Sequence, residues 1–221
     1  MKIRTHSRLK ATIAAAGAAA AASVYLLRKW RDGWNATAEE TACRMPLDEE
    51  VEDPTYVTNR AITIRALPEH IWPWLAQMGE SPRGGFYSYL PVERLLGMKV
   101  ENAEEVLSEF QNPEVGEPLD RAGTMRVKAV VRNHVLVLGP PPTPDLSVTW
   151  ALALYPIDGT TRLVSRCRAR LPRGWRGMAA RVVLDPGQLV MERKMLIEIK
   201  KRAEKLAARS HFEILPERQA G

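Results

Sequence analysis

The chain offers few side chains of the kinds that perform metal or nucleophilic chemistry. Its four histidines lie far apart without metal-ligand spacing; they are His6, His70, His134 and His211. The two cysteines, Cys43 and Cys167, form neither a CxxC motif nor a disulfide framework, and no Ser/His/Asp or Cys/His set accompanies them. We therefore expect no metal, no cofactor and no catalytic residue that the sequence alone can name.

Aromatic and sulfur-containing side chains offer a different chemistry, the binding of a flat or flexible apolar molecule. The same residue types are also ordinary core residues, so the pattern predicts either a lined cavity or a solid core. The residues that we expect to line a cavity are Trp72 or Trp74, Phe86, Tyr87, Tyr89, Trp150, Ser165, Cys167, Ala169, Met191 and Met195. At least one of the charged residues 192–194 could reach it, although such residues are commonly structural ion pairs or solvent-facing.

An alternating strand and a long amphipathic helix, far apart in the chain, position these side chains. Residues 56–65 alternate, with Ile62 and Ile64 opposite Thr63, and a short helix with the two tryptophans follows. Residues 174–209 form an amphipathic helix, which Asp185-Pro186-Gly187 is expected to interrupt near its start. The stretch between them is rich in β-structure, which predicts an antiparallel sheet wrapped around one long C-terminal helix.

The last strand, residues 161–171, has two faces of different character. Arg162, Arg166, Arg168 and Arg170 share the predicted outer face with Val164. The inward set is Leu163, Ser165, Cys167, Ala169 and Leu171. Three of these five are small, and a closely packed core would normally hold larger groups opposite a helix. The pattern favours a real cavity between sheet and helix.

The intervening elements are less regular. We expect short helices at 91–97 and 102–110, with Asn102 as an N-cap, and the Gly84-Gly85 loop as a turn that brings aromatic residues inside. Residues 124–131 predict a strand whose odd-numbered residues share one face. Residues 147–155 and 161–171 predict a hairpin across an Asp-Gly turn.

Residues 55–208, approximately, carry a resemblance to a known superfamily in three runs: "ITIRALPEHIWPWLAQMG", "GGFYSY" and "DPGQLVMERKMLIEIKKRAE". They resemble the SRPBCC (START-like, helix-grip) superfamily, and within it the polyketide-cyclase and lipid-transport-like members. The resemblance implies an α+β helix-grip fold, while the superfamily's activities range from lipid carriage to cyclisation, hormone reception and oxygenase subunits. Many relatives carry an acidic residue after "YSY", where this chain has Leu90-Pro91, so chemistry that depends on that acid is expected to be lost here.

The N-terminal 31 residues contain seven Lys/Arg and no acid, and residues 11–27 within them carry no charge. Seventeen residues are the lower limit for a bilayer core of roughly 30 Å, and flanking basic residues and tryptophans suit the headgroup zone. We expect a single membrane-spanning helix as an anchor. A cleaved signal peptide and a soluble alanine-rich helix remain alternatives.

Composition divides the first 55 residues into an anchor (1–31) and an acidic linker (32–55). The resemblance implies an SRPBCC/START-like domain over 56–209, and a tail (210–221) follows it. Residues 32–55 hold eight acids and one arginine, which favours a solvated, self-repelling, extended linker. The net charge of +6 is divided among segments without a nucleic-acid motif, so no nucleic-acid partner is expected.

The connection before the closing helix is rich in arginine. One interpretation is a solvated connection between strand and helix. The other is a membrane-binding lip beside the cavity mouth, which contacts lipid headgroups through Arg173, Trp175 and Arg176.

Three functions remain open on this evidence. The first is a membrane-tethered module that binds or transports a hydrophobic small molecule, such as a lipid, fatty acid or polyketide-like compound. The second is a cyclase- or dehydratase-type enzyme on the same fold, which would need a general acid or base with a tuned pKa. The third is an interaction protein with a vestigial cavity.

Overall fold

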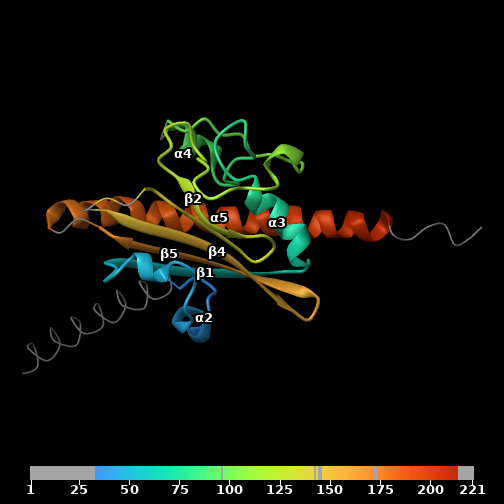
Figure 1. Cartoon of the computed structure of the whole chain (residues 1–221), viewed down its shortest axis with the longest axis horizontal. Helices are drawn as coiled ribbons and strands as arrows, with labels where there is room; N and C mark the ends of the chain where they lie inside the picture. The colour runs from blue at the N-terminus through green and yellow to red at the C-terminus, as the bar shows by residue number, and fades with distance from the viewer. Residues whose placement is uncertain (1–32, 96, 142, 144–145, 172–173, 214–221) are drawn as a thin grey trace, which may run out of the picture.

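The protein is an α+β domain in which one antiparallel sheet carries a long C-terminal helix on one face (Figure 1). The computed structural model describes residues 33–213 except 96, 142, 144–145 and 172–173, with the backbone only for 175–186 and 211–213. The sheet order is β1-β5-β4-β3-β2. The strands are β1 (Tyr56–Ile64), β2 (Arg126–Val131), β3 (Val135–Gly139), β4 (Ser147–Ile157) and β5 (Thr160–Arg170). The arrangement is consistent with a helix grip.

The β4–β5 hairpin confirms the predicted pairing and turn. Asp158 and Gly159 both have positive φ, +43° and +77°, which is the conformation that a two-residue hairpin turn requires. The register pairs Ser147 with Arg170 and Ile157 with Thr160, so the two strands match along their full length. β1 pairs with β5 on the other side, from Tyr56 opposite Ala169 to Ile64 opposite Thr161.

Strand β2 departs from the predicted alternation. A register shift between Val127 and Ala129 inserts an irregularity into its pairing with β3. Val127 is buried in the main core, but Ala129 packs on the opposite face of the sheet and Val131 is exposed. The expectation that all odd-numbered residues of 124–131 share one face is therefore wrong, because the bulge reverses the side-chain direction midway.

Helix α3 (Pro68–Ala76) is the predicted tryptophan-bearing helix, with proline at its first position, where no intrahelical donor is lost. Arg83 closes its C-terminal end by donating to the carbonyl oxygens of Ala76 and Met78, at 2.7 Å each. The next helices are short: α4 (Leu90–Leu95) and the 3₁₀ turn η2 (Ser108–Phe110).

The predicted helix over 102–110 is wrong, because Asn102 does not cap a helix. Its side chain accepts from the Tyr87 backbone N–H at 2.8 Å and donates to the Ser88 carbonyl at 3.2 Å. It thereby holds the aromatic loop in place. Gly85 lies in this loop with φ +80°, and a Cβ there would lie 2.6 Å from the Glu101 carbonyl oxygen, so the loop packs too closely for any other residue.

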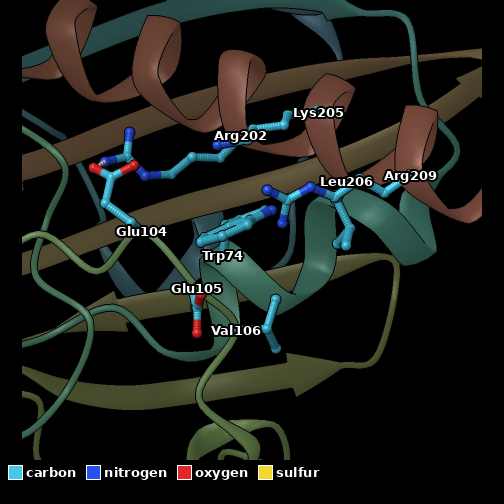
Figure 2. Close-up of a pocket in the computed structure, with 8 residues that line it drawn as sticks. All are labelled: Trp74, Glu104, Glu105, Val106, Arg202, Lys205, Leu206 and Arg209. Atoms are coloured by element: carbon cyan, nitrogen blue, oxygen red, sulfur yellow. Dashed lines mark hydrogen bonds and ion pairs between the residues drawn. The ribbon is translucent and has the colours of Figure 1, made fainter.

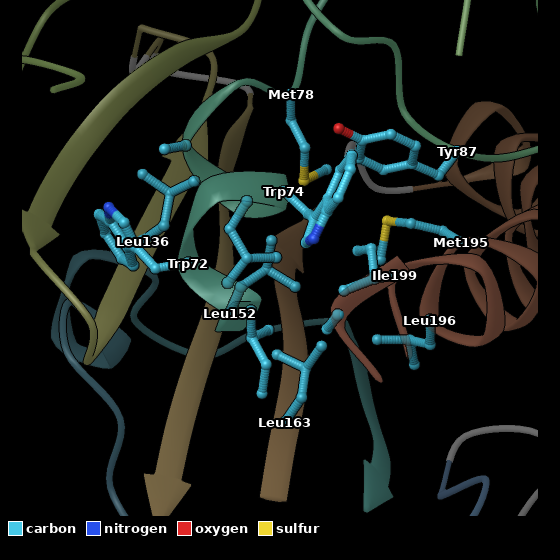
Figure 3. Packing of buried hydrophobic residues seen from close by; sticks show 14 of the residues in the cluster. Trp72, Trp74, Met78, Tyr87, Leu136, Leu152, Leu163, Met195, Leu196 and Ile199 are labelled. Carbon is cyan, nitrogen blue, oxygen red and sulfur yellow. The ribbon is translucent and has the colours of Figure 1, made fainter. Parts of the chain in front are cut away.

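Helix α5 (Trp175–Glu213) is continuous, so residues 185–187 do not divide it as expected. Its buried stripe meets the sheet and α3, and Figure 3 shows Met195, Leu196 and Ile199 facing Leu152 and Leu163. This spacing of three to four residues is the amphipathic period that the sequence predicted. The main core lies between α5, α3 and this inner face of the sheet.

The outer face of the sheet is covered by residues 33–55, which contain α2 (Ala38–Ala42) and the 3₁₀ turn η1 (Asp48–Glu50). In Figure 1 α2 lies on the side of the sheet opposite α5. Met45 and Val51 are buried, and Met45 packs in a second cluster with Val137 and Val164. The extended, solvated linker expected for 32–55 is therefore corrected: from residue 33 onward this segment is a folded cover.

Ion pairs fix this cover to the arginines of β5. Arg166 is 3 % exposed, and all of its guanidinium nitrogens donate to oxygen atoms. The acceptors are Asn59, the Asp48 carboxylate, and the carbonyl groups of Cys43, Glu40 and Thr41. Arg162 pairs with Glu40 at 2.6 Å. Two of the acids that suggested self-repulsion, Glu40 and Asp48, are thus neutralised by the predicted arginine face.

No helix within the described residues is both apolar and long enough to span a membrane. The predicted anchor, residues 1–31, lies outside them.

Replacing Met45 with alanine tests whether residues 33–55 belong to the folded unit. Met45→Ala should lower the free energy of unfolding by about 2–5 kcal/mol, because it opens a cavity in the outer-face cluster. The neighbouring Arg44, whose side chain is exposed, serves as control, and Arg44→Ala should change stability by less than about 0.5 kcal/mol. Urea unfolding measures both, and equal small effects would show that the cover is not part of the cooperative unit.

Candidate ligand-binding site

The inner face of the sheet changes from apolar to polar along the strands. Ile62 and Leu163 pair across β1 and β5 in the apolar half, beneath Ile199 of α5. The next inward pair is Arg60 with Ser165. Beyond these lie two further cross-strand pairs, Thr58 with Cys167 and Tyr56 with Ala169. One half of the space under α5 is therefore a sealed core, and the other half carries polar and small side chains.

A buried ion pair joins the sheet to α5 where these halves meet. The Arg60 guanidinium contacts the Glu192 carboxylate through Nη1, which also donates to Thr58 Oγ1 at 3.2 Å. The other Glu192 oxygen accepts from Ser165 Oγ at 2.5 Å, and Ser165 accepts from Trp150 Nε1 at 2.8 Å. The chain Trp150–Ser165–Glu192–Arg60 thus crosses from β4 to β1 by way of the helix. It explains why a small residue stands at position 165.

Burial determines the ionisation of this cluster. It raises the pKa of Glu192, while the Arg60 charge and the Ser165 hydrogen bond oppose the rise. Burial, with Glu192 adding to it, raises the pKa of the Cys167 thiol to about 12, against hydrogen bonding to Gln188 and the Arg60 charge. Cys167 therefore stays a thiol near neutral pH, in a state unsuited to nucleophilic attack.

The predicted aromatic residues divide between two places. Figure 3 shows Trp72 beside Leu136, away from α5, and Trp74 on the side of Tyr87 and Met195. The Trp74 and Tyr87 rings meet edge to face at 6.2 Å, and the Tyr87 hydroxyl accepts from Gln77 at 2.9 Å. Of the two tryptophans, Trp74 is the one that approaches the helix, and both are buried core residues.

The remaining predicted residues differ in how far they are covered. Phe86 and Met195 are buried, whereas Trp150 and Met191 are only partly covered. Tyr89 is 42 % exposed with Lys194 Nζ 5.8 Å from its ring centre, so it lies at the surface beside α5. The lip candidates Arg173, Trp175 and Arg176 lie outside the described side chains.

A separate hollow of about 250 Å³ opens near the C-terminal half of α5 (Figure 2). Arg202, Lys205 and Arg209 of the helix face Trp74 of α3 and the loop residues 104–106 across it. Arg202 is already committed to this framework, because it pairs with Glu104 and Glu198 and donates to the Ala103 carbonyl at 3.0 Å. Only Trp74 belongs to both this hollow and the predicted cavity.

Arg60 and Glu93 are among the buried charged residues that were missed from the sequence. Arg60 could have been found by extending the strand alternation, since it shares the parity of Ile62 and Ile64. Glu93 of α4 is 1 % exposed, and its Oε2 has no hydrogen-bond partner among the described residues. Burial raises its pKa. The signal for Glu93 was its spacing of three residues from the inward Leu90 in an apolar helix.

Comparisons with known proteins give structural neighbours only. No protein-family model matches the chain, and no curated protein matches its sequence. A Mesorhizobium loti protein is 17% identical, with 70% of this chain and 98% of that chain covered and a TM-score of 0.36. A Nitrosomonas europaea protein is 11% identical, with 69% of this chain and 96% of that chain covered and a TM-score of 0.42. A Mycobacterium smegmatis protein is 14% identical, with 71% of this chain and 94% of that chain covered and a TM-score of 0.39.

The pH dependence of stability tests the ionisation of Glu192. Its pKa is higher in the folded protein than the ordinary 4.5, so the folded state loses stability as pH rises through the interval above 4.5. The stability of wild type relative to Glu192→Gln should therefore fall as pH rises from about 4.5, as measured by urea unfolding between pH 3 and 8.

Glu198 on the same helix is the matched control. Partial burial raises its pKa, but hydrogen bonds from Lys194, Lys201 and Arg202 outweigh this and lower it to about 2. The advantage of wild type over Glu198→Gln should grow as pH rises toward 4.5 and then level off. A Glu192→Gln difference that is independent of pH above 4.5 would contradict the assignment.

Proposed function

We propose that the domain binds an apolar small molecule between the sheet and α5, and that residues 1–31 attach it to a membrane. We also propose that the helix-grip fold of this domain is of the START-like type. The observation that carries the proposed binding is the polar half of the inner face, where Cys167 and Ala169, beyond the hydrogen-bonded Ser165, present little volume toward the helix. A ligand between sheet and helix would contact these small side chains directly.

Incomplete covering at the same place supports the proposal. Trp150 projects from β4 beside Ser165, and Met191 lies one helical turn before the buried Met195, yet both are partly exposed. Tryptophan and methionine suit an apolar ligand because one offers a flat surface and the other a flexible thioether.

An enzyme of cyclase or dehydratase type is the second candidate, and buried carboxyl groups favour it. Glu93 and Glu192 both have raised pKa values, as a general acid near neutral pH requires. Lipid extraction of the purified protein followed by mass spectrometry separates the two functions. A co-purifying apolar compound supports binding, its chemical conversion by the protein supports catalysis, and the absence of any such compound counts against both.

Filling the space beside β1 should compete with the ligand. Ala169→Phe adds a ring on the inward face, and it should weaken saturable binding of a fluorescent naphthalene probe at least tenfold while costing about 1–3 kcal/mol of stability. Arg170→Phe adds the same ring on the opposite face and should leave probe affinity unchanged. Equal probe affinity in wild type and Ala169→Phe would place the ligand elsewhere, and outright unfolding of Ala169→Phe would identify the site as solid core.

Membrane attachment is tested by fractionation. The full-length chain should sediment with membranes and resist alkaline carbonate washing, because a spanning helix is held by burial of apolar area rather than by charge. A chain that begins at Gly33 retains the sheet cover and should remain in the supernatant. Full-length protein with an intact N-terminus that is released by carbonate would refute the anchor.

A further inference from the structure

Arg60 presents an unusual pattern of hydrogen bonding for a buried arginine. Its side chain is fully buried, and Nη1 serves both Glu192 and Thr58. Its Nε and Nη2 have no acceptor among the described residues, although neither is accessible to solvent. A buried N–H without an acceptor is costly, and a charged one more so. The described residues therefore leave one whole edge of this guanidinium without an acceptor.

The chemistry of that edge is specific. Nε–H and Nη2–H point in parallel from one side of the planar guanidinium, and such a pair matches the two oxygens of a carboxylate. Arg166, on the other face of the sheet, shows that this fold can supply acceptors to every nitrogen of a buried arginine. The lack of acceptors for Arg60 Nε and Nη2 is thus a feature of the inner face of the sheet.

The surroundings fit a molecule with an apolar body. Thr58, Cys167 and the partly covered Trp150 continue from Arg60 along the inward rows of the sheet. Among the described side chains, Glu192 is the acid that lies against Arg60. Burial raises the pKa of Glu192, which favours its protonated form when a second carboxylate approaches Arg60.

We propose that Arg60 binds the carboxylate of an apolar carboxylic acid, such as a fatty acid, through its Nε and Nη2 edge. This inference rests on the proposed function and narrows it from any apolar compound to an acid.

Comparing an acid with the alcohol of the same chain length tests this in the full-length protein. Dodecanoate should displace the naphthalene probe at a concentration about tenfold to a hundredfold lower than 1-dodecanol, the range that a charge-assisted hydrogen-bonded pair supplies. Arg60→Met should abolish this preference while leaving the affinity for 1-dodecanol within about threefold. Arg60→Lys should retain only part of it, because lysine keeps the charge but lacks the paired donors.

Three further measurements control for effects of arginine in general, for binding of a free anion and for misfolding of Arg60→Met. Arg162→Met, an arginine on the outer face, should leave the preference for acid unchanged. Acetate tests for a free anion: displacement of the probe by acetate at the concentrations effective for dodecanoate would overturn the proposal. If Arg60→Met does not fold, the double variant Arg60→Met/Glu192→Leu replaces the buried pair by apolar groups, an exchange that proteins commonly tolerate.

Failure of this inference differs from failure of the proposed function. Equal displacement of the probe by dodecanoate and 1-dodecanol in wild type overturns the role of Arg60 but leaves apolar binding intact. A full preference for the acid in Arg60→Met and in Arg60→Lys has the same consequence. If no probe, acid or alcohol binds, both proposals fall.

Discussion

The structure depends on the covering of strand β5 on both faces. The strand lies between β1 and β4, so its backbone is paired on both sides and its side chains alternate between two environments. Arg166 on one face and Ser165 on the other are both buried. A buried guanidinium needs acceptors for its donors, and the segment before β1 supplies them through Asp48 and three carbonyl groups. The folded unit therefore begins before the first strand.

The same alternation explains the contrast between the two buried arginines. Arg166 points to the outer face, where a separate segment wraps around it, and its pairing fastens that segment to the sheet. Arg60 points to the inner face, where α5 approaches with one carboxylate. A helix presents side chains but few backbone acceptors, because its carbonyl groups are already bonded within the helix. An arginine beneath a helix is consequently harder to satisfy than one beneath a loop.

Periodic features were predictable from the sequence, and long-range polar contacts were not. β1, the β4–β5 hairpin, the two faces of β5 and the stripe on α5 all follow from periods of two or 3.6 residues. The folded cover at residues 33–55 was missed because two of its acids, Glu40 and Asp48, are neutralised by Arg162 and Arg166, which lie more than a hundred residues away. The β2 bulge was missed because an inserted residue leaves no mark on composition. Of the site, the small residues of β5 were found, and one of the charged residues 192–194 was expected to reach them. That this residue is Glu192 and that it binds Ser165 required the helix to be docked.

The Arg60–Glu192 pair is not explained by stability. Taking two charges out of water carries a desolvation cost that their attraction repays only with good geometry and full hydrogen bonding. Hydrogen bonding here is incomplete, since two nitrogens of Arg60 have no acceptor among the described residues. Apolar residues of similar size at positions 60 and 192 would extend the core formed by Ile62, Leu163 and Ile199 without that cost. A buried pair with incomplete hydrogen bonding, placed where small side chains face the helix, is the feature on which the proposed recognition of an acid rests.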